Sequence, residues 1–528
     1  MRRLFLMLAG LCLLFAGRAQ ALTPEQARAI AAGDTDERVA ALNAAVARGE
    51  PGLAAFVQAL LDDAVKLAPK QVLVIDGEKV LDAASGQPAP LPEDAEDVVN
   101  NNRMRGALQA ALASLKLGSP ELATRSEAVA ELARQSLDES QLPLLDQALA
   151  AESDAGLKAR LTLMRAALVI ASSPDKAKRL EAARQLAGSG EGAVKSLILE
   201  RLAAESDGEV KSALSQALAK IEARLAWGER LGLLFTGISL GSILLLVALG
   251  LAITYGLMGV INMAHGELMM VGAYATYVVQ NCFRAWLPPG LFDCYVLLAV
   301  PLSFLAAAAV GAVLERGVIR WLYGRPLETL LATWGISLVL MQAVRTLFGA
   351  QNVPVENPAW LSGGLQVLPN LVLPYNRLAI IAFALLVLGG VALLIARTRL
   401  GLFVRGVTQN RRMAACVGIN TARIDTYAFG LGAGIAGLAG CALSQVGNVG
   451  PDLGQSYIVD SFMVVVLGGV GQLAGTVIAA LGLGVLNKLL EGFAGAVLAK
   501  IMVLVFIVVF IQKRPQGLFA MKGRSAEA

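Results

Sequence analysis

The sequence predicts an all-α fold in which a secreted helical domain precedes a polytopic bundle of membrane helices. The 528 residues are 56% hydrophobic, but the two parts of the chain differ sharply. Residues 22–228 carry 30 acidic and 23 basic side chains, whereas the last 300 residues carry only 11 and 19. From residue 229 onward, apolar stretches long enough to cross a bilayer follow one another. We therefore expect a signal peptide at 1–21, a soluble domain at 22–228, a membrane domain at 229–515 and a cytoplasmic tail at 516–528.

The first 21 residues have the pattern of a secretory signal peptide. Arg2 and Arg3 precede an apolar run from Leu4 to Ala16, and Ala19-Gln20-Ala21 places small residues where cleavage occurs. The run is shorter than the roughly 20 residues that a membrane helix needs. Whether it is cleaved or stays as an anchor, the residues that follow are expected to lie outside the cytoplasm.

The soluble domain is expected to be helical, with one small hairpin. Residues 71–81 alternate apolar side chains on both sides of Asp76-Gly77, which is typical of two strands joined by a tight turn. Further on, Ala150-Ala-Glu-Ser-Asp154 recurs as Ala203-Ala-Glu-Ser-Asp207. Two related units of about 50 residues indicate a short HEAT-like stack, a shape used for docking proteins. General similarity among alanine-rich helices is the alternative.

The membrane half contains about nine apolar stretches, some of them broken. The stretch at 459–470 is short and runs into Gly468-Gly-Val-Gly471, which indicates a break or a re-entrant segment. The stretches are 231–256, 262–281, 294–314, 329–349, 377–396, 427–446, 459–470, 474–491 and 496–512.

Positive charges predict the orientation of these stretches. Loops that a secreted front domain places inside carry thirteen Lys and Arg residues, whereas the loops placed outside carry only Arg284. Cytoplasmic loops of membrane proteins are enriched in these residues. We therefore expect a multi-pass protein of the bacterial inner membrane, with its N-terminal domain in the periplasm and its C-terminus in the cytoplasm.

Polar residues at the start of the second stretch are the first candidate for a substrate path. Asn262, His265 and Glu267 lie where a helix is expected to begin, and charges inside a bilayer generally face a cavity or a partner. A helix that begins inside the membrane also directs free N–H groups at a polar solute. The alternative is that Asn262 and Glu267 cap a helix at the membrane surface and that His265 is structural.

Glycines form the second candidate. Gly468, Gly469 and Gly471 accompany the predicted break, where exposed backbone groups could line a path. The glycines between 430 and 440 lie in one stretch and are explained by close helix packing.

The predicted cytoplasmic loop at 397–425 is the third feature. It is long and basic and contains a short amphipathic helix that ends near Gly418. A connection between two helices needs only about 2–8 residues. The excess indicates a docking surface for a cytoplasmic partner, and a solvated basic loop is the alternative.

Several function classes find no support. The single histidine excludes a site with several histidine ligands, and no Cys/His spacing typical of a metal site is present. Gly237-Ile-Ser239-Leu-Gly241 fits G-x-S-x-G but lies inside a spanning stretch, where no catalytic elbow is expected. No Walker A sequence exists, so an ATP-driven process would need another polypeptide to bind ATP. We expect no catalytic residue, no metal and no cofactor in this chain, and no nucleic-acid partner because basic patches with interleaved aromatics are missing.

Cys282 and Cys294 flank a short loop that is expected to lie outside the cytoplasm. A disulfide between them would persist there. Two isolated apolar thiols are the alternative.

Five stretches of the membrane half together carry a family resemblance. They are Ser239–Ser242, Tyr255–Glu267 with Gly272-Ala-Tyr274, Ala332–Ser337, Val407–Asn420 and Met463–Gly471. In this combination the sequence resembles the branched-chain amino acid (LivH-type) family of ABC importer permeases from Leu231 to Phe519. The long secreted front domain and the ending Lys513-Arg-Pro-Gln-Gly-Leu-Phe519 resemble the urea-importing members of that family.

The resemblance implies a transport permease rather than an enzyme. Its expected partners are a second homologous permease, two cytoplasmic ATP-binding subunits and a periplasmic solute-binding protein, all in contact with membrane lipid. For a flat neutral solute such as urea, Tyr274 or Trp334 could pack against the molecule. A branched-chain amino acid or a short amide is the alternative solute, and a passive urea channel is the alternative of another class. The loop residues expected to couple to the ATPase are Arg405, Arg411, Arg412, Ala414, Ala415, Gly418 and Asn420, although the loop lacks the acidic residue that usually precedes the two alanines.

Overall fold

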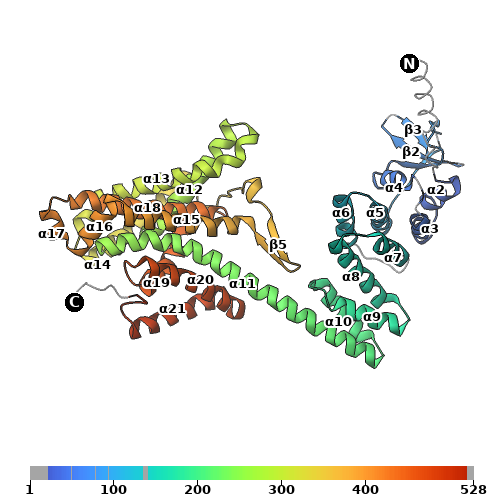
Figure 1. Cartoon of the computed structure of the whole chain (residues 1–528). Coiled ribbons are helices and arrows are strands. Elements are labelled where there is room, and N and C mark those ends of the chain that lie inside the picture. Colours follow the sequence, from blue (N-terminus) through green and yellow to red (C-terminus); the bar gives the residue numbers. More distant parts are fainter. Residues whose placement is uncertain are drawn as a thin grey trace, which may run out of the picture. The chain divides into compact units, whose positions relative to one another are not determined.

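The computed structural model describes residues 22–519, apart from residues 49, 51, 70, 78, 93 and 135–140. The predicted signal peptide at 1–21 and residues 520–528 of the predicted tail lie outside the described residues. The chain divides into two compact units, Met1–Leu225 and Ala226–Ala528, which are described separately (Figure 1).

The first unit begins with helices packed on a small antiparallel sheet. The strands have the order β3-β2-β1-β4. The predicted hairpin is confirmed, because β2 and β3 pair antiparallel with Asp76 opposite Lys79, and Gly77 has a positive φ of 60° in the turn. Ile30, Leu42 and Met104 are fully buried in the core beside this sheet. The elements are α2 (Pro24–Ala31), α3 (Thr35–Arg48), α4 (Leu53–Leu61), β1 (Val65–Leu67), β2 (Val72–Asp76), β3 (Lys79–Asp82), β4 (Glu96–Asp97) and α5 (Asn102–Lys116).

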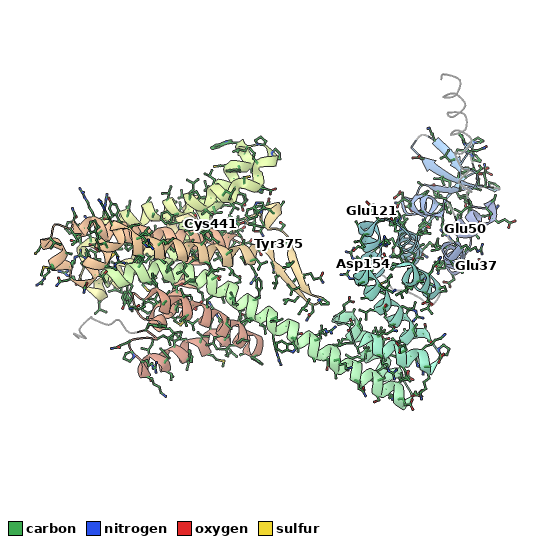
Figure 2. The ribbon with its side chains drawn as sticks, in the orientation of Figure 1. Glu37, Glu50, Glu121, Asp154, Tyr375 and Cys441 are labelled. Carbon is green, nitrogen blue, oxygen red and sulfur yellow. The ribbon has the colours of Figure 1, made fainter. Side chains whose placement is uncertain are left out.

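A stack of antiparallel helices follows. It comprises α6 (Leu122–Leu132), α7 (Leu142–Ala151), α8 (Ala155–Ser172), α9 (Lys176–Leu186), α10 (Gly192–Ala204) and the beginning of α11 (Gly208–Met258). Local signals start these helices. Asp154, labelled in Figure 2, caps α8 by accepting a 2.9 Å hydrogen bond from the backbone N–H of Leu157.

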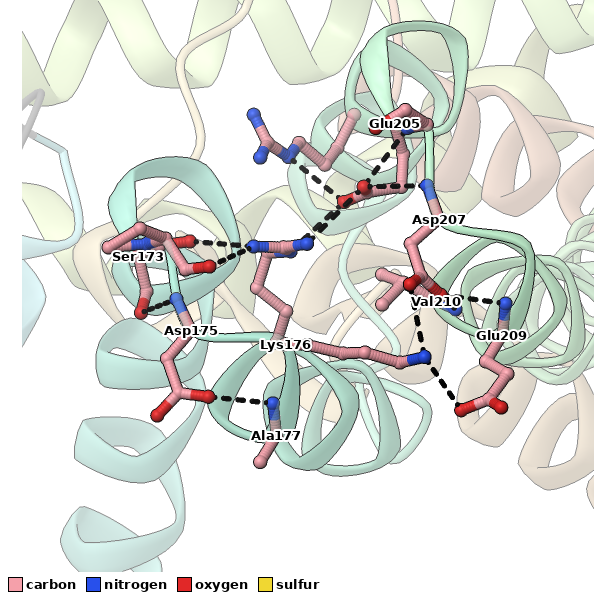
Figure 3. A network of polar contacts seen from close by, with 12 residues as sticks. Ser173, Asp175, Lys176, Ala177, Glu205, Asp207, Glu209 and Val210 are labelled. Carbon is pink, nitrogen blue, oxygen red and sulfur yellow. Dashed lines mark hydrogen bonds and ion pairs between the residues drawn. The ribbon is translucent and has the colours of Figure 1, made fainter.

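The repeated sequence corresponds to a repeated ion pair. Arg125 holds Glu152 with contacts of 2.9 and 3.1 Å, and Arg179 holds Glu205 with an Nε–Oε2 separation of 3.1 Å. Each arginine also donates to two carbonyl groups at the start of its own helix. Figure 3 shows the second network, in which Lys176 joins it by contacting Asp207. The hydrogen bonds from Arg125 lower the pKa of Glu152 to about 2.

The second unit is a helical bundle. Within its described residues, seven helices are long and apolar enough to cross a membrane, counting α11. Two further helices do not meet this criterion: α12 (His265–Trp286) is more polar than the seven, and α19 (Leu453–Gly468) is shorter. The remaining long helices are α13 (Tyr295–Gly317), α14 (Pro326–Phe348), α15 (Tyr375–Arg397), α18 (Thr421–Ser444), α20 (Leu473–Ala494) and α21 (Ala496–Lys513).

Short elements connect these helices. A hairpin that was not predicted from the sequence precedes α15, where β5 and β6 pair antiparallel. The connecting elements are η2 (Pro289–Cys294), η3 (Ile319–Leu322), η4 (Ala359–Leu361), β5 (Gly364–Leu368), β6 (Leu371–Pro374), α16 (Arg399–Gln409) and α17 (Arg411–Cys416).

Helix α18 lies at the centre of the bundle, and its glycines allow this position. A Cβ atom on Gly437 would lie 2.5 Å from the carbonyl oxygen of Ser303 on α13. A Cβ atom on Gly440 would lie 2.0 Å from the carbonyl oxygen of Met269 on α12. The expected close packing is therefore confirmed for Gly432, Gly434, Gly437 and Gly440, where an added Cβ would lie within 2.7 Å of a neighbouring atom, but not for Gly430, where the nearest atom would be 3.6 Å away. Cys441, labelled in Figure 2, is buried on the same helix.

Candidate substrate site at two helix N-termini

Two helices of the second unit begin against each other. Helix α12 starts at His265 and α19 starts at Leu453. A Cβ atom on Gly266 would lie 2.4 Å from the carbonyl oxygen of Gly454, so the two first turns are in backbone contact. Free N–H groups and the positive ends of both helix dipoles meet at this point. The arrangement suits a polar or negatively charged group of a solute.

This meeting point lies partway along the neighbouring spanning helices rather than at their ends. Ser337, which contacts Glu267, is at the middle of α14 (Pro326–Phe348). His265 contacts the carbonyl oxygen of Val247, well before α11 ends at Met258. Polar groups at such a depth generally serve a pathway or pair with one another.

Glu267 is the buried carboxyl group of the site. Its Oε1 accepts a 3.0 Å hydrogen bond from the hydroxyl of Ser337, and both side chains are buried. Its Oε2 has no hydrogen-bond partner among the described residues. A buried acceptor without a hydrogen-bond partner destabilises the protein, and a hydrogen bond donated by a solute would remove this cost. The oxygen is therefore available to bind a solute.

Asn262 and Tyr274 supply further unpaired polar atoms. The Oδ1 of Asn262 accepts a hydrogen bond from the N–H of Ala264 at 3.1 Å, but its Nδ2 has no partner in the described part of the chain. The ring of Tyr274 packs on Phe348 with centroids 4.8 Å apart, and its buried hydroxyl is also unpaired within the described residues. The first three turns of α12 and Asn262 before them therefore carry an amide donor, a carboxyl acceptor and a hydroxyl that can do either.

Asp452 adds negative charge near the start of α12. It is the exposed residue before α19, and it lies close enough to Glu267 and Tyr274 for its charge to act on both.

Asp452 and Ser337 were not predicted from the sequence. A signal for Ser337 existed, since Thr333 and Ser337 lie one helical turn apart and so share a face of α14. Thr333 also contacts this region, through a 3.2 Å hydrogen bond from the N–H of Met263.

His265 is held by the packing around it. Its Nε2 lies 3.2 Å from the carbonyl oxygen of Val247, which makes Nε2 the protonated nitrogen. A Cβ atom on Gly250 would lie only 3.0 Å from the same nitrogen. This geometry favours the structural alternative for His265, which fixes the start of α12 against α11.

Other residues expected in the path are not brought to this site. Trp334 is 54% exposed on α14 and does not join the buried cluster. Gly468, Gly469 and Gly471 lie at the opposite end of α19, roughly 20 Å from Gly454 at 1.5 Å per residue.

The predicted break is nevertheless present after α19. Gly469 and Gly471 have positive φ values of 98° and 79°, which end the helix. The segment after α21 packs on this turn, where the N–H of Leu518 donates to the carbonyl oxygen of Leu467 at 2.8 Å. These glycines therefore shape a turn that holds the C-terminal segment.

The predicted loop forms two short helices, α16 and α17. Asn410 caps α17 through the N–H of Met413, and Asn420 caps α18 through the N–H of Arg423. Gly418 has a positive φ of 87°, which allows the tight reversal between them.

Ala414 is buried against Val407 and Ile424. The other expected residues surround this small core: Arg405 donates to the carbonyl oxygen of Ile395, while Arg411, Arg412 and Ala415 are exposed.

Cys282 and Cys294 are both free thiols in the structure, so no disulfide joins them. Cys294 is exposed and ends η2, while Cys282 is half-buried on α12. This is the arrangement of two isolated thiols.

Comparison with known proteins identifies the second unit. A family model described as the permease component of branched-chain amino acid transport systems matches residues 233–511. Among similar proteins is the permease protein BraD of a high-affinity branched-chain amino acid transport system of Pseudomonas aeruginosa. It is 29% identical over 289 residues, which cover 54% of this chain and 94% of BraD. The permease proteins LivH and LivM of Escherichia coli, from a system of the same description, are 27% and 26% identical over 54% of this chain, covering 94% and 69% of their own lengths. No solved structure matches the chain.

Proposed function

Because the chain belongs to the family of branched-chain amino acid transport system permease components, we propose that it forms the solute pathway of an ATP-driven importer. It works with a second homologous permease, two cytoplasmic ATP-binding subunits and a periplasmic solute-binding protein. The pairing is supported by Escherichia coli, where LivH and LivM are two different permease proteins of one transport system. The permease itself carries no ATPase chemistry.

Urea is the solute that we propose first. The observation that carries this choice is the set of unpaired buried atoms at the site, the Nδ2 of Asn262, the Oε2 of Glu267 and the hydroxyl of Tyr274. A small neutral amide needs both kinds of partner, since its N–H groups donate to a carboxyl oxygen and its carbonyl accepts from an amide or a hydroxyl. The first unit also lies outside the matched residues 233–511, so this chain departs from the amino acid permeases there.

A branched-chain amino acid is the second candidate. The named relatives transport this class by their description. The two helix N-termini at Gly266 and Gly454 could hold its carboxylate, and the carboxyl groups of Glu267 and Asp452 could hold its ammonium group. The same site therefore supports either solute by different contacts.

Transport proceeds by alternating access. The ATP-binding subunits close on α16 and α17, and this movement opens the helices around Glu267 first to one side and then to the other. We expect the front domain, with its HEAT-like stack, to dock a protein in the periplasm.

Uptake by the assembled transporter in vesicles tests these choices. Labelled urea and labelled leucine are supplied separately, each with and without ATP and with the other solute as competitor. Urea uptake that requires ATP and resists leucine supports the first candidate, and the reverse result supports the second. Solute equilibration without ATP would identify a passive channel and overturn the importer.

A further inference from the structure

A buried carboxyl group connects three elements at the end of the bundle that carries α16 and α17. Glu315, in the last turn of α13, is fully buried. Arg320 of η3 contacts its two oxygens at 3.2 and 3.1 Å, and the hydroxyl of Thr426 on α18 donates to it at 2.7 Å. Arg320 also reaches the carbonyl oxygen of Ala422 at 3.3 Å, so α13, η3 and α18 share one network.

A second arginine connects the short loop helix to the same place. Arg411, the first residue of α17, donates two hydrogen bonds to the carboxylate of Asp425 on α18, one of them at 3.2 Å. Asp425 is only 3% exposed. The guanidinium of Arg411 lies 4.8 Å above the ring of Tyr323, which follows η3. Asp425 and Thr426 are adjacent, so the two networks meet on one turn of α18.

These contacts resist separation. Removing one partner of a buried ion pair leaves an uncompensated charge away from water, which is far more destabilising than losing a surface pair. The paired, two-contact geometry of an arginine with a carboxylate also fixes orientation as well as distance. Helix α17 and the first turn of α18 are therefore held as one body with the end of α13.

Helix α18 extends from these ion pairs to the candidate substrate site. A Cβ atom on Gly432 would lie 2.7 Å from the carbonyl oxygen of Gly250 on α11, next to His265. A Cβ atom on Gly272 of α12 would lie 2.2 Å from the carbonyl oxygen of Gly437 on α18. Because the backbones of the two helices are in direct contact, a displacement of α18 must move α12 with it. Glu267 lies in the first turn of α12.

We propose that Asp425 and Glu315, clamped by Arg411 and Arg320, form the joint that transmits movement of α17 to the solute site. All four are positioning residues, since none touches the solute. This inference rests on the proposed function, because it assumes that α16 and α17 face an ATP-binding subunit. It goes beyond that function by assigning the transmission step to named pairs that lie behind the docking surface.

The ratio of solute taken up to ATP hydrolysed tests the joint in the assembled transporter. Asp425→Asn removes the charge while keeping the shape, and Asp425→Glu keeps the charge. We expect Asp425→Asn to assemble with its partners and hydrolyse ATP within about twofold of wild type, while uptake per ATP falls at least about tenfold. Asp425→Glu is expected to recover most of that ratio. A loss of folding alone would lower ATP hydrolysis and uptake together.

Two further variants keep the test decisive. Thr426→Val removes the hydroxyl bonded to Glu315 with little change in shape, so it is expected to lower the same ratio even where Asp425→Asn fails to assemble. Arg325→Gln disrupts the exposed pair with Glu328 and is the matched control, with no expected effect. An unchanged ratio in Asp425→Asn, or in Thr426→Val where the former does not assemble, would overturn the joint. If wild-type uptake does not depend on ATP, the proposed function fails instead.

Discussion

Ser337 on α14 donates a 3.0 Å hydrogen bond to one carboxyl oxygen of Glu267 on α12, while the other oxygen has no partner among the described residues. This contact fixes the orientation of the carboxyl group at the point where α12 and α19 begin. The free oxygen, the unpaired amide of Asn262 and the hydroxyl of Tyr274 are the groups that a solute would meet. The contact between α12 and α14 therefore sets the geometry of the site.

Ser337→Ala is expected to weaken transport without disrupting the fold. Leaving the buried Oε1 of Glu267 without this partner costs about 1–3 kcal/mol, so losing the hydrogen bond should raise the KM for uptake about fivefold or more. Concentration-dependent uptake in vesicles measures this change. Thr346→Ala on the same helix is the control, because Thr346 is exposed and bonds only to the carbonyl oxygen of Gln342. Equal KM values for the two variants would refute the role of Ser337.

Gly272→Ala is expected to destabilise the bundle. The new methyl group would lie 2.2 Å from the carbonyl oxygen of Gly437, so α12 and α18 would have to separate. Overpacking of this kind costs about 1–3 kcal/mol. Thermal unfolding of the purified chain in detergent measures it, with Gly335→Ala as the control because nothing lies within 4 Å of a Cβ atom there. A melting temperature for Gly272→Ala that equals the control would contradict the packing.

The pair of Arg125 and Glu152 predicts how the helical stack responds to acid. Arg125 lowers the pKa of Glu152 from its ordinary value of 4.5 to about 2. The carboxylate form therefore stabilises the fold fully above pH 4.5, and this contribution is lost as the pH falls from 4.5 through about 2. The protection factors of the α7 and α8 amides, which correct for the pH dependence of intrinsic exchange, should fall in the full chain as the pH drops through this range.

Arg125→Gln should remove most of that pH dependence, because the pKa of Glu152 would return toward its ordinary value. Arg134→Gln is the control, since Arg134 is an exposed residue paired with Glu131 one turn away. Identical exchange profiles for Arg125→Gln and wild type would show that the ion pair does not hold the helices.

Two exposed cysteines report the orientation of the membrane unit. Cys294 lies in a loop predicted to be periplasmic, and Cys416 ends α17 in a loop predicted to be cytoplasmic. In intact cells, a membrane-impermeant maleimide admitted to the periplasm is expected to label a chain that keeps only Cys294 and not one that keeps only Cys416. The opposite pattern would invert the orientation.

The sequence predicted the fold class because hydropathy and charge are properties of single segments. The helical bundle, the hairpin at 71–81 and the glycine packing of α18 all follow from local patterns. The β5–β6 hairpin was missed because its strands, GLQVL and LVLP, are apolar at nearly every position and lack the alternation that indicates a strand.

The candidate site was predicted in part. Asn262 and Glu267 stood out because polar groups are rare in apolar stretches, whereas Tyr274 was expected only to pack its ring against a flat solute. Asp452 and Ser337 did not, because their importance depends on which helices meet in space. Trp334 was expected to pack against a flat solute and the glycines at 468–471 to expose backbone at a helix break, but the structure places both away from the start of α12.

Uptake by Glu267→Gln in the assembled transporter tests the central claim most directly. The substitution preserves size and can still accept the hydrogen bond from Ser337, but it replaces one acceptor oxygen with an N–H donor. We expect uptake to fall below about a tenth of wild type while the subunits still assemble. Uptake at the wild-type rate would contradict a solute site at the start of α12.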